Sequence, residues 1–168
     1  MSRRTLISLA KDNIKHAKAG SVSLATSTMK VPAVEYTDEK KWLLEREKIF
    51  RRLPLLVAMS CELPEAQSYL CTEFADVPII ITRDENFELH AMLNSCGHRG
   101  AQLLEPGCGK IKKLTCPYHA WRYALDGSLA NVFANDIFGE IDKSKHGLIR
   151  LPVYYYYVHL LLLQSLFL

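Results

Sequence analysis

Two short stretches of the sequence decide the fold: Cys96-Gly97-His98, and Cys116-Pro117-Tyr118-His119 a little further along the chain. Each stretch offers one thiolate and one imidazole. In an extended chain, residues two apart point to the same face, so the first pair can converge on one site. The second pair converges around a turn that its proline restricts. The pattern predicts two facing loops that enclose a polynuclear metal centre.

The order of the ligands distinguishes between two metals. Structural zinc also takes two cysteines and two histidines, but zinc fingers place both cysteines in one half of the motif and both histidines in the other. Here each half is mixed, which suits a 2Fe–2S cluster with two thiolates on one iron and two imidazoles on the other. The spacing therefore favours an iron–sulfur centre. A zinc-binding interaction module is the alternative from another class.

With its neighbours included, this region resembles the Rieske domain of ring-hydroxylating oxygenase α-subunits. The resemblance is carried by residues 96–101 (CGHRGA), 116–121 (CPYHAW) and 122–127 (RYALDG). It extends upstream through residues 45–50 and through Ile79, Arg83 and Asn94, and covers about residues 35–153. It implies a mainly β fold, an antiparallel Rieske-type β-sandwich that carries the cluster on two loops, with N-terminal helices (α+β overall).

The resemblance also implies a role for each site residue. Cys96 and Cys116 would bind the buried iron, and His98 and His119 the outer iron, from which the electron leaves. Four further residues match the family's surround of the cluster: Arg99, Gly100, Tyr118 and Trp121. Plain core packing is an equal reading for Trp121. Gly97 and Gly100 would let the backbone approach the sulfides.

In that family the cluster takes electrons from a ferredoxin or flavin reductase. It passes them to a mononuclear iron in a separate C-terminal domain, where O2 attacks an aromatic or other organic substrate; the full-length α-subunits can form homo-oligomers. Such an iron needs two histidines and a carboxylate. The remaining histidines, His16, His90, His146 and His159, form no closely spaced pair beside an acid. We therefore expect no catalytic residues and no oxygenase turnover from this chain alone, with Fe(II) only in a catalytic domain beginning near residue 160. A stand-alone Rieske ferredoxin-like carrier is the alternative.

The composition limits the other classes of function. The chain has 168 residues and a formal net charge of +3, too weak a balance for dedicated nucleic-acid binding. Five cysteines without a regular framework of pairs favour a reducing, cytoplasmic compartment. Ser2-Arg3-Arg4 resembles a twin-arginine signal, but the apolar run that follows is shorter than the 7–15 residues or so that export needs. The pattern instead predicts an amphipathic helix that packs on a partner or on the body through Leu6, Ile7, Leu9 and Ile14.

The pattern predicts three segments. Residues 1–34 form an arm, residues 35–153 the Rieske domain with a leading helix capped by Thr37, and residues 154–168 an apolar tail that starts the missing catalytic domain. Strands are expected at residues 55–59, 69–72, 77–82 and 87–93, with a second hairpin around Asp126-Gly127. The tail is too short and too interrupted to span a membrane. We expect it to leave an apolar surface, so that removing residues 159–168 improves solubility.

Three cysteines lie outside the two motifs. Cys61 and Cys71 are expected to be small buried apolar residues, and Cys108 to lie on the loop between the motifs, exposed and away from the cluster. Basic residues around the motifs would steer an acidic ferredoxin, or simply form a solvated loop; they are Arg99, Lys110, Lys112, Lys113 and Arg122.

Overall fold

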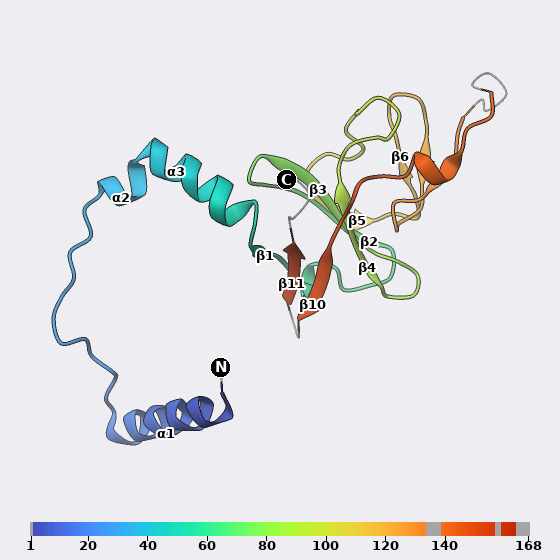
Figure 1. The fold of residues 1–168 in the computed structure, drawn as a ribbon. Coiled ribbons are helices and arrows are strands. Elements are labelled where there is room, and N and C mark those ends of the chain that lie inside the picture. The colour runs from blue at the N-terminus through green and yellow to red at the C-terminus, as the bar shows by residue number, and fades with distance from the viewer. Residues whose placement is uncertain (1, 134–138, 157–158, 164–168) are drawn as a thin grey trace. The chain divides into compact units, whose positions relative to one another are not determined.

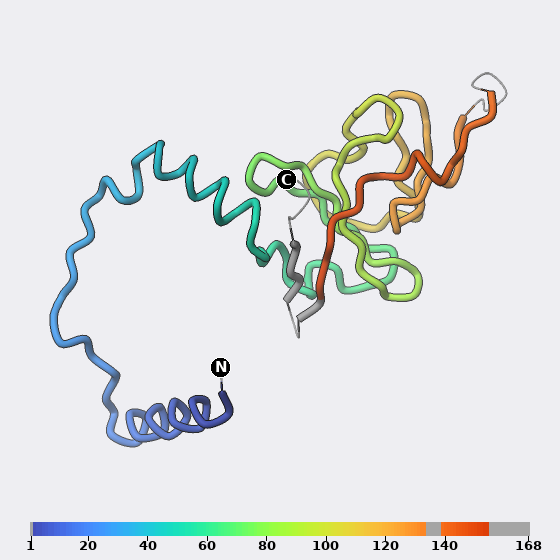
Figure 2. Tube along the Cα trace, in the orientation of Figure 1, coloured from blue at the N-terminus to red at the C-terminus, as the bar shows by residue number. Residues whose placement is uncertain are grey.

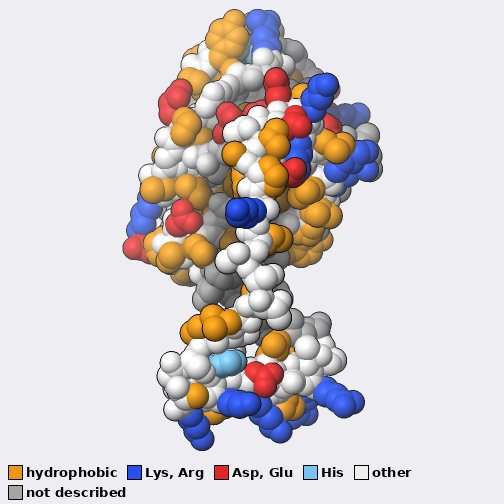
Figure 3. Space-filling model, turned by 90° about the vertical axis from the view of Figure 1, so that its left-hand side faces the viewer, with side chains coloured by type: hydrophobic (Ala, Val, Ile, Leu, Met, Phe, Trp, Pro, Cys, Tyr) orange, Lys and Arg blue, Asp and Glu red, His pale blue; other side chains and the backbone are white. Residues whose placement is uncertain are grey.

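The computed structural model describes residues 2–133, 139–156 and 159–163, and the chain divides after Asp38 into two compact units. The N-terminal unit contains α1 (Arg3–Ala19), which begins where the Ser2 hydroxyl accepts a hydrogen bond from the Thr5 amide and ends at Gly20 in the left-handed conformation. All its side chains are exposed or nearly so, and Figure 3 shows its Lys and Arg side chains gathered along one side. The predicted helix is thus confirmed, whereas its packing on a partner or on the body stays a prediction, because none of its residues is buried.

The helix predicted after Thr37 begins later than expected. Thr37 is the last residue of the short helix α2 (Val34–Thr37), and its hydroxyl donates to the Ala33 carbonyl, so the assignment of Thr37 as an N-cap is wrong. In the second unit, α3 (Glu39–Glu45) continues into the π-helical turn η1 (Arg46–Phe50). Trp42 and Phe50 share one face, with ring centroids 5.5 Å apart.

Five antiparallel strands form the central sheet, in the order β5-β2-β3-β4-β9 (Figure 1). Their bounds are β5 (Gly107–Lys110), β2 (Ser68–Phe74), β3 (Val77–Arg83), β4 (Leu89–Leu93) and β9 (Arg150–Leu151). The strands predicted within β2, β3 and β4 are confirmed. The sequence did not indicate β5, because Gly-Cys-Gly-Lys has little β propensity and is paired only through its long-range partner β2.

The middle strand β3 separates two apolar cores. Ile80 is buried in a core that also holds Cys96, Cys116 and the other residues beneath the two motifs. On the opposite face, Ile79 and Ile81 are buried with Ala58 and Leu63. Successive side chains of a strand point to opposite faces, so an unbroken run of isoleucines fits a strand that is covered on both sides.

A small sheet supports the second motif. It consists of β6 (Leu114–Thr115), β7 (Arg122–Tyr123) and β8 (Leu129–Asn131). The predicted hairpin is confirmed: Asp126 accepts hydrogen bonds from the Ser128 amide and hydroxyl, and Gly127 has a φ of 83°, which glycine adopts without strain. Figure 2 shows the path of the chain through this region, in yellow and orange.

The third sheet contains the part of the C-terminal tail that the structure describes. Its order is β1 (Pro54–Met59), β11 (His159–Leu163) and β10 (Val153–Tyr156), all antiparallel. Residues 157–158 and 164–168 of the predicted tail lie outside the described residues. No described helix is both long enough and apolar enough to cross a membrane. That residues 154–168 start a catalytic domain stays a prediction.

The place of β11 changes the expected effect of shortening the chain. Because β11 lies between β1 and β10, removing residues 159–168 takes away the strand with which both are paired. We therefore expect the shortened chain to melt at a lower temperature and to aggregate more, the opposite of the sequence-based expectation, since unpaired strand edges promote association. Thermal unfolding and light scattering of the two lengths measure this. Equal melting temperatures with better solubility of the shorter chain would restore the original expectation.

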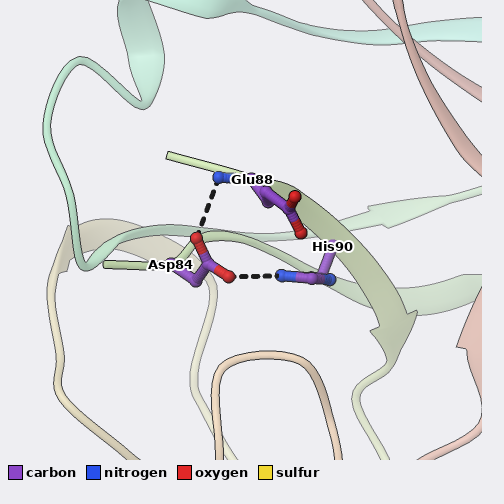
Figure 4. A group of neighbouring side chains, drawn as sticks. All are labelled: Asp84, Glu88 and His90. Carbon is purple, nitrogen blue, oxygen red and sulfur yellow. Dashed lines mark hydrogen bonds and ion pairs between the residues drawn. The ribbon is translucent and has the colours of Figure 1, made fainter. Parts of the chain in front are cut away.

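The turn between β3 and β4 is organised by Asp84 (Figure 4). One carboxylate oxygen accepts hydrogen bonds from the backbone amides of Asn86 and Glu88, and the other lies 3.0 Å from Nε2 of His90. His90 is thus a satisfied sheet histidine, as the sequence indicated. Glu88 also lies in this group, but both oxygens of Asp84 are already engaged in shaping the turn.

Replacing Asp84 by asparagine is expected to lower the free energy of unfolding by about 1.5–3 kcal/mol near neutral pH, as for other hydrogen bonds to a charged group. Partial burial alone would raise the pKa of Asp84, but the hydrogen bonds from His90, Glu88 and Asn86 outweigh it and lower the pKa. The carboxylate's contribution is therefore complete above its unfolded pKa of about 3.9 and is lost as the pH falls through the lower folded pKa. Denaturant titrations of both proteins should converge at acid pH. A difference in unfolding free energy between the two proteins that stays constant until acid unfolds them would contradict this account.

Candidate metal centre

The first motif is a tight loop closed by its own backbone. The Cys96 amide donates to the Ala101 carbonyl at 2.8 Å, and the Gly100 amide donates to the Cys96 carbonyl at 2.9 Å. Gly100 has a φ of 70°, in the left-handed region that favours glycine. The loop therefore turns the chain back on itself and presents the side chains of residues 96 and 98.

The second motif repeats this geometry. The Cys116 amide donates to the Trp121 carbonyl at 2.8 Å, and the Ala120 amide donates to the Cys116 carbonyl at 3.0 Å. Ala120 takes the place of Gly100 and has a φ of 53°, which is uncommon for a residue with a side chain. Two loops of the same construction thus face each other, although their sequences share few residues.

The four predicted ligands come together between the loops. Cys96 and Cys116 are 4% and 3% exposed, whereas His98 and His119 are half-buried. The two imidazole rings have centroids 4.8 Å apart and meet edge to face. Burial raises the pKa of the Cys96 thiol, and the neighbouring Cys116 raises it further. Because the two thiols are buried and the two imidazoles only half-buried, the thiols lie on the inner side of the site and the imidazoles on the outer side.

These residues fit a 2Fe–2S cluster. Nδ1 of His119 is buried and has no hydrogen-bond partner among the described residues, which suits a nitrogen that binds metal. Burial lowers the pKa of His98, and the positive charges of His119, Arg99 and His146 lower it further. A lowered pKa keeps the imidazole neutral, the form that binds a metal. Two buried thiols and two imidazoles match the ligand set of a Rieske centre.

Tyr123 contacts this site from β7, a role that the sequence analysis missed. Its hydroxyl oxygen accepts a hydrogen bond from the Gly97 amide at 3.1 Å and lies 3.0 Å from Sγ of Cys96. Burial raises the pKa of Tyr123, so its hydroxyl keeps its proton. When Cys96 binds iron its sulfur is a thiolate, which can only accept, so the tyrosine hydroxyl would then donate to the sulfur. The sequence did contain a sign of this contact. Tyr123 comes two residues after Trp121, and side chains two apart on a strand point to the same face.

The predicted surround divides into buried and exposed residues. Trp121 is 2% exposed, belongs to the core beneath the loops, and stacks on His98 with the ring planes 6° apart. Trp121 is thus a core residue that also contacts a predicted ligand, and its role beside the cluster stays a prediction. Tyr118 is 61% exposed and lies against His119, with ring centroids 3.8 Å apart. Arg99 and Gly100 are exposed.

A segment far along the sequence explains Gly97. A Cβ atom at position 97 would lie 2.8 Å from the carbonyl oxygen of His146 and 3.2 Å from that of Gly147. The first loop thus packs directly against the backbone of residues 146–147. From the sequence alone, Gly97 is expected to allow close approach to the sulfides, because nothing in the sequence places this segment beside the loop.

Replacing Gly97 by alanine is expected to displace the loop or the segment that covers it and to reduce the iron bound per chain several-fold. The contact involves backbone atoms on both sides, so it cannot be relieved by a side-chain movement. Gly100→Ala is the matched comparison, because its Cβ would meet nothing closer than 3.7 Å and it introduces only backbone strain. Iron analysis of the two purified variants decides the matter. Equal iron content in both would show that the close contact is unimportant.

The remaining cysteines differ from one another. Cys71 is buried, and its sulfur accepts a hydrogen bond from Asn94, as predicted for a core residue. Cys61 is exposed in the 3₁₀ turn Ser60–Glu62, so the prediction that it is buried is wrong. A cysteine that ends a strand region can face either way, and the turn directs this one outward. Cys108 is exposed on the edge strand β5, and none of the five cysteines is in a disulfide.

The positive charge predicted around the site is partly compensated. Lys110 is paired with Glu65. Lys112 and Lys113 border a cavity of about 400 Å³ whose wall also carries Asp84, Glu88 and Asp126. Arg99 and Arg122 are exposed. A basic docking surface for an acidic ferredoxin therefore stays a prediction that rests mainly on these two arginines.

The fold and the paired loops define a class: antiparallel β proteins that hold an iron–sulfur cluster between two cysteine–histidine loops. Comparison with known families is decisive. Residues 54–141 match the Rieske [2Fe-2S] domain, so the chain belongs to this family and carries its 2Fe–2S cofactor. The predicted family, fold and cluster are thereby confirmed. The assignment of individual ligands to the irons stays a prediction.

Relatives with curated functions are oxygenase subunits. The chain is 42% identical over 119 residues to a glycine betaine monooxygenase oxygenase subunit of Chromohalobacter salexigens, covering 70% of this chain and 26% of that protein. It is 39% identical over 120 residues to a carnitine monooxygenase oxygenase subunit of Escherichia coli, covering 71% and 32%. An anthranilate 1,2-dioxygenase large subunit of Acinetobacter baylyi is 38% identical over 114 residues, covering 67% and 24%. The chain thus spans about a quarter to a third of the length of these relatives.

Solved structures agree. The naphthalene 1,2-dioxygenase from a Rhodococcus species superimposes with a TM-score of 0.74 at 32% identity, covering 80% of this chain and 31% of that one. A quaternary ammonium Rieske monooxygenase superimposes with a TM-score of 0.71 at 35% identity, covering 80% and 37%. The fold is therefore that of the Rieske part of Rieske oxygenases.

Proposed function

We propose that this chain carries one electron at a time through a 2Fe–2S cluster held by Cys96, His98, Cys116 and His119, as the Rieske part of an oxygenase α-subunit. The observation that supports this most directly is the convergence of two buried thiols and two half-buried imidazoles from two loops of equal geometry. The cluster supplies reversible one-electron chemistry when it is bound.

The chain's own residues shape how the electron enters and leaves. Cys96 and Cys116 lie within the core, which keeps water from the inner half of the site. His98 and His119 lie at its outer half, beside the exposed Tyr118. We propose that this outer surface meets the electron donor, a reductase or ferredoxin in the cytoplasm, and the acceptor, a mononuclear iron outside the described residues.

The described residues offer no obvious second iron site of their own. Outside the two loops, one group of three potential ligands is found in the described part of the chain: Asp84, Glu88 and His90. It has one histidine where a mononuclear oxygenase iron takes two, and Asp84 is engaged in the turn. We propose that O2 chemistry depends on a domain supplied elsewhere, and expect no product from this chain with a reductase and O2.

The substrate of the whole oxygenase is a further proposal. The sequence resemblance implied an aromatic substrate, and the relatives named for anthranilate and naphthalene support an aromatic substrate. Several other relatives are named for glycine betaine or carnitine. With identities of 42% and 39%, these favour a quaternary ammonium compound by a small margin, and we propose that class first.

Anaerobic purification tests the proposal. We expect a red-brown protein with about two irons and two sulfides per chain, a Rieske-type electron paramagnetic resonance (EPR) spectrum after reduction, and no zinc. Reduction by NAD(P)H and a reductase should be reversible on exposure to O2. One zinc per chain without visible absorbance would instead establish the zinc-binding module.

A further inference from the structure

Residues 142–148 form a strap across the first cluster loop. Leu148 anchors one end, with its side chain buried and its amide donating to the Gly127 carbonyl at 2.8 Å. Near the other end, Nζ of Lys143 donates to the Ala130 carbonyl at 3.1 Å. The strap therefore rests on the hairpin that follows the second motif, while its backbone contacts Gly97 of the first.

The strap holds the ring of His146 in a defined orientation. Nδ1 lies 2.9 Å from the Asp142 carbonyl oxygen, which can only accept, so Nδ1 carries a proton and donates it. Asp142 is itself fixed, because its carboxylate accepts hydrogen bonds from the amide and hydroxyl of Ser144. The imidazole of His146 is thus tied to the turn from which it projects.

Trp121 connects this ring to a cluster ligand. The ring of His146 meets Trp121 edge to face, with centroids 5.8 Å apart and planes at 68°. Trp121 stacks in turn on His98, with centroids 4.8 Å apart and planes at 6°. The three rings form a column that begins on the strap and ends at the outer side of the site. Rotation of an imidazole about its last side-chain bond is otherwise only weakly restricted.

We infer that His146 is a positioning residue for the cluster: it fixes Trp121, and Trp121 fixes the ring plane of His98. This inference rests on the proposed role of His98 as an iron ligand. Contacts beyond the ligands orient them and tune the metal. The orientation of His98 is therefore set by the strap, a segment that neither motif contains.

Three variants test the column: His146→Ala removes the ring, His146→Phe keeps an aromatic ring without the imidazole nitrogens, and Lys145→Ala changes an exposed neighbour on the same strap. The readouts are iron per chain, the EPR spectrum of the reduced cluster and its reduction potential.

We expect His146→Ala to bind iron but to shift and broaden the EPR spectrum, and His146→Phe and Lys145→Ala to resemble the wild type. Both substitutions of His146 remove the imidazole nitrogens, so a difference between the two variants reports the effect of the aromatic ring. Should His146→Ala lose its iron, His146→Leu, which fills a similar volume without an aromatic ring, replaces it.

Two results would overturn the inference: a non-aromatic variant with full iron and the wild-type spectrum and potential, or a phenylalanine variant that is as perturbed as the alanine variant. Failure of the proposed function is distinguishable from both. It would appear in the wild type itself, as the absence of iron or of a Rieske-type EPR spectrum.

Discussion

Replacing His119 by alanine is expected to abolish the iron–sulfur cluster or to leave it labile. The buried Nδ1 of His119 has no hydrogen-bond partner among the described residues, so with the proposed ligand set its replacement removes a metal ligand and no hydrogen bond of that nitrogen to the protein. Cys96→Ser should have the same effect, because its sulfur is buried between the loops and faces Tyr123. Visible absorbance and iron analysis of anaerobically purified protein measure the loss.

Matched controls separate ligand loss from general damage. Cys108→Ser changes an exposed thiol on β5, and His90→Ala changes a histidine that pairs with Asp84 in a distant turn. Both are expected to keep the full iron content. An unchanged spectrum in the His119 variant, or equal loss of iron in the controls, would refute the proposed ligand set.

The sequence predicted those features that depend on neighbours along the chain. The two ligand pairs, the isoleucine run of β3 and the Asp126-Gly127 turn are each encoded within a few residues. Their spacing therefore indicated both the chemistry and the local structure.

Features that depend on distant partners were missed or misread. Strand β5 exists because β2 offers it an edge, and β11 occupies the middle of a sheet between strands more than ninety residues apart in sequence. The contact of Gly97 with the backbone of residues 146–147 could not be predicted either, and the glycine was assigned only to close approach to the sulfides. The periodicity of the sequence contains no information on such long-range contacts. The exposure of the Cys61 side chain depends on them as well.

The reduction potential of the cluster is expected to lie near the low end of the Rieske range, about −150 mV. High-potential Rieske proteins of respiratory complexes, which resemble this chain in their ligands, add a cysteine to each ligand loop and join the two in a disulfide. Here Ala101 stands at the first such position, Tyr118 and Ala120 flank His119 at the second, and none of the five cysteines is in a disulfide. Fewer hydrogen-bond donors to the cluster stabilise its more negative reduced state less.

One donor is nevertheless present, and its removal should lower the potential further. The Tyr123 hydroxyl, positioned by the Gly97 amide, donates to the sulfur of Cys96. Tyr123→Phe removes this bond and keeps the buried ring. We expect a potential more negative by roughly 60 mV, which corresponds to a tenfold change in the equilibrium of a one-electron couple. Tyr118→Phe is the matched control, since it removes an exposed hydroxyl and keeps the ring beside His119.

Protein-film voltammetry at neutral pH on the wild type and both variants decides between the possible outcomes. A wild-type potential well below zero, unchanged in Tyr118→Phe and lowered in Tyr123→Phe, is what the geometry predicts. A potential well above zero would place this chain with the respiratory type, and the oxygenase assignment would then be wrong. Equal potentials in all three proteins would show that the bond from Tyr123 is equally strong in both redox states, because a hydrogen bond alters a potential only through the difference between them.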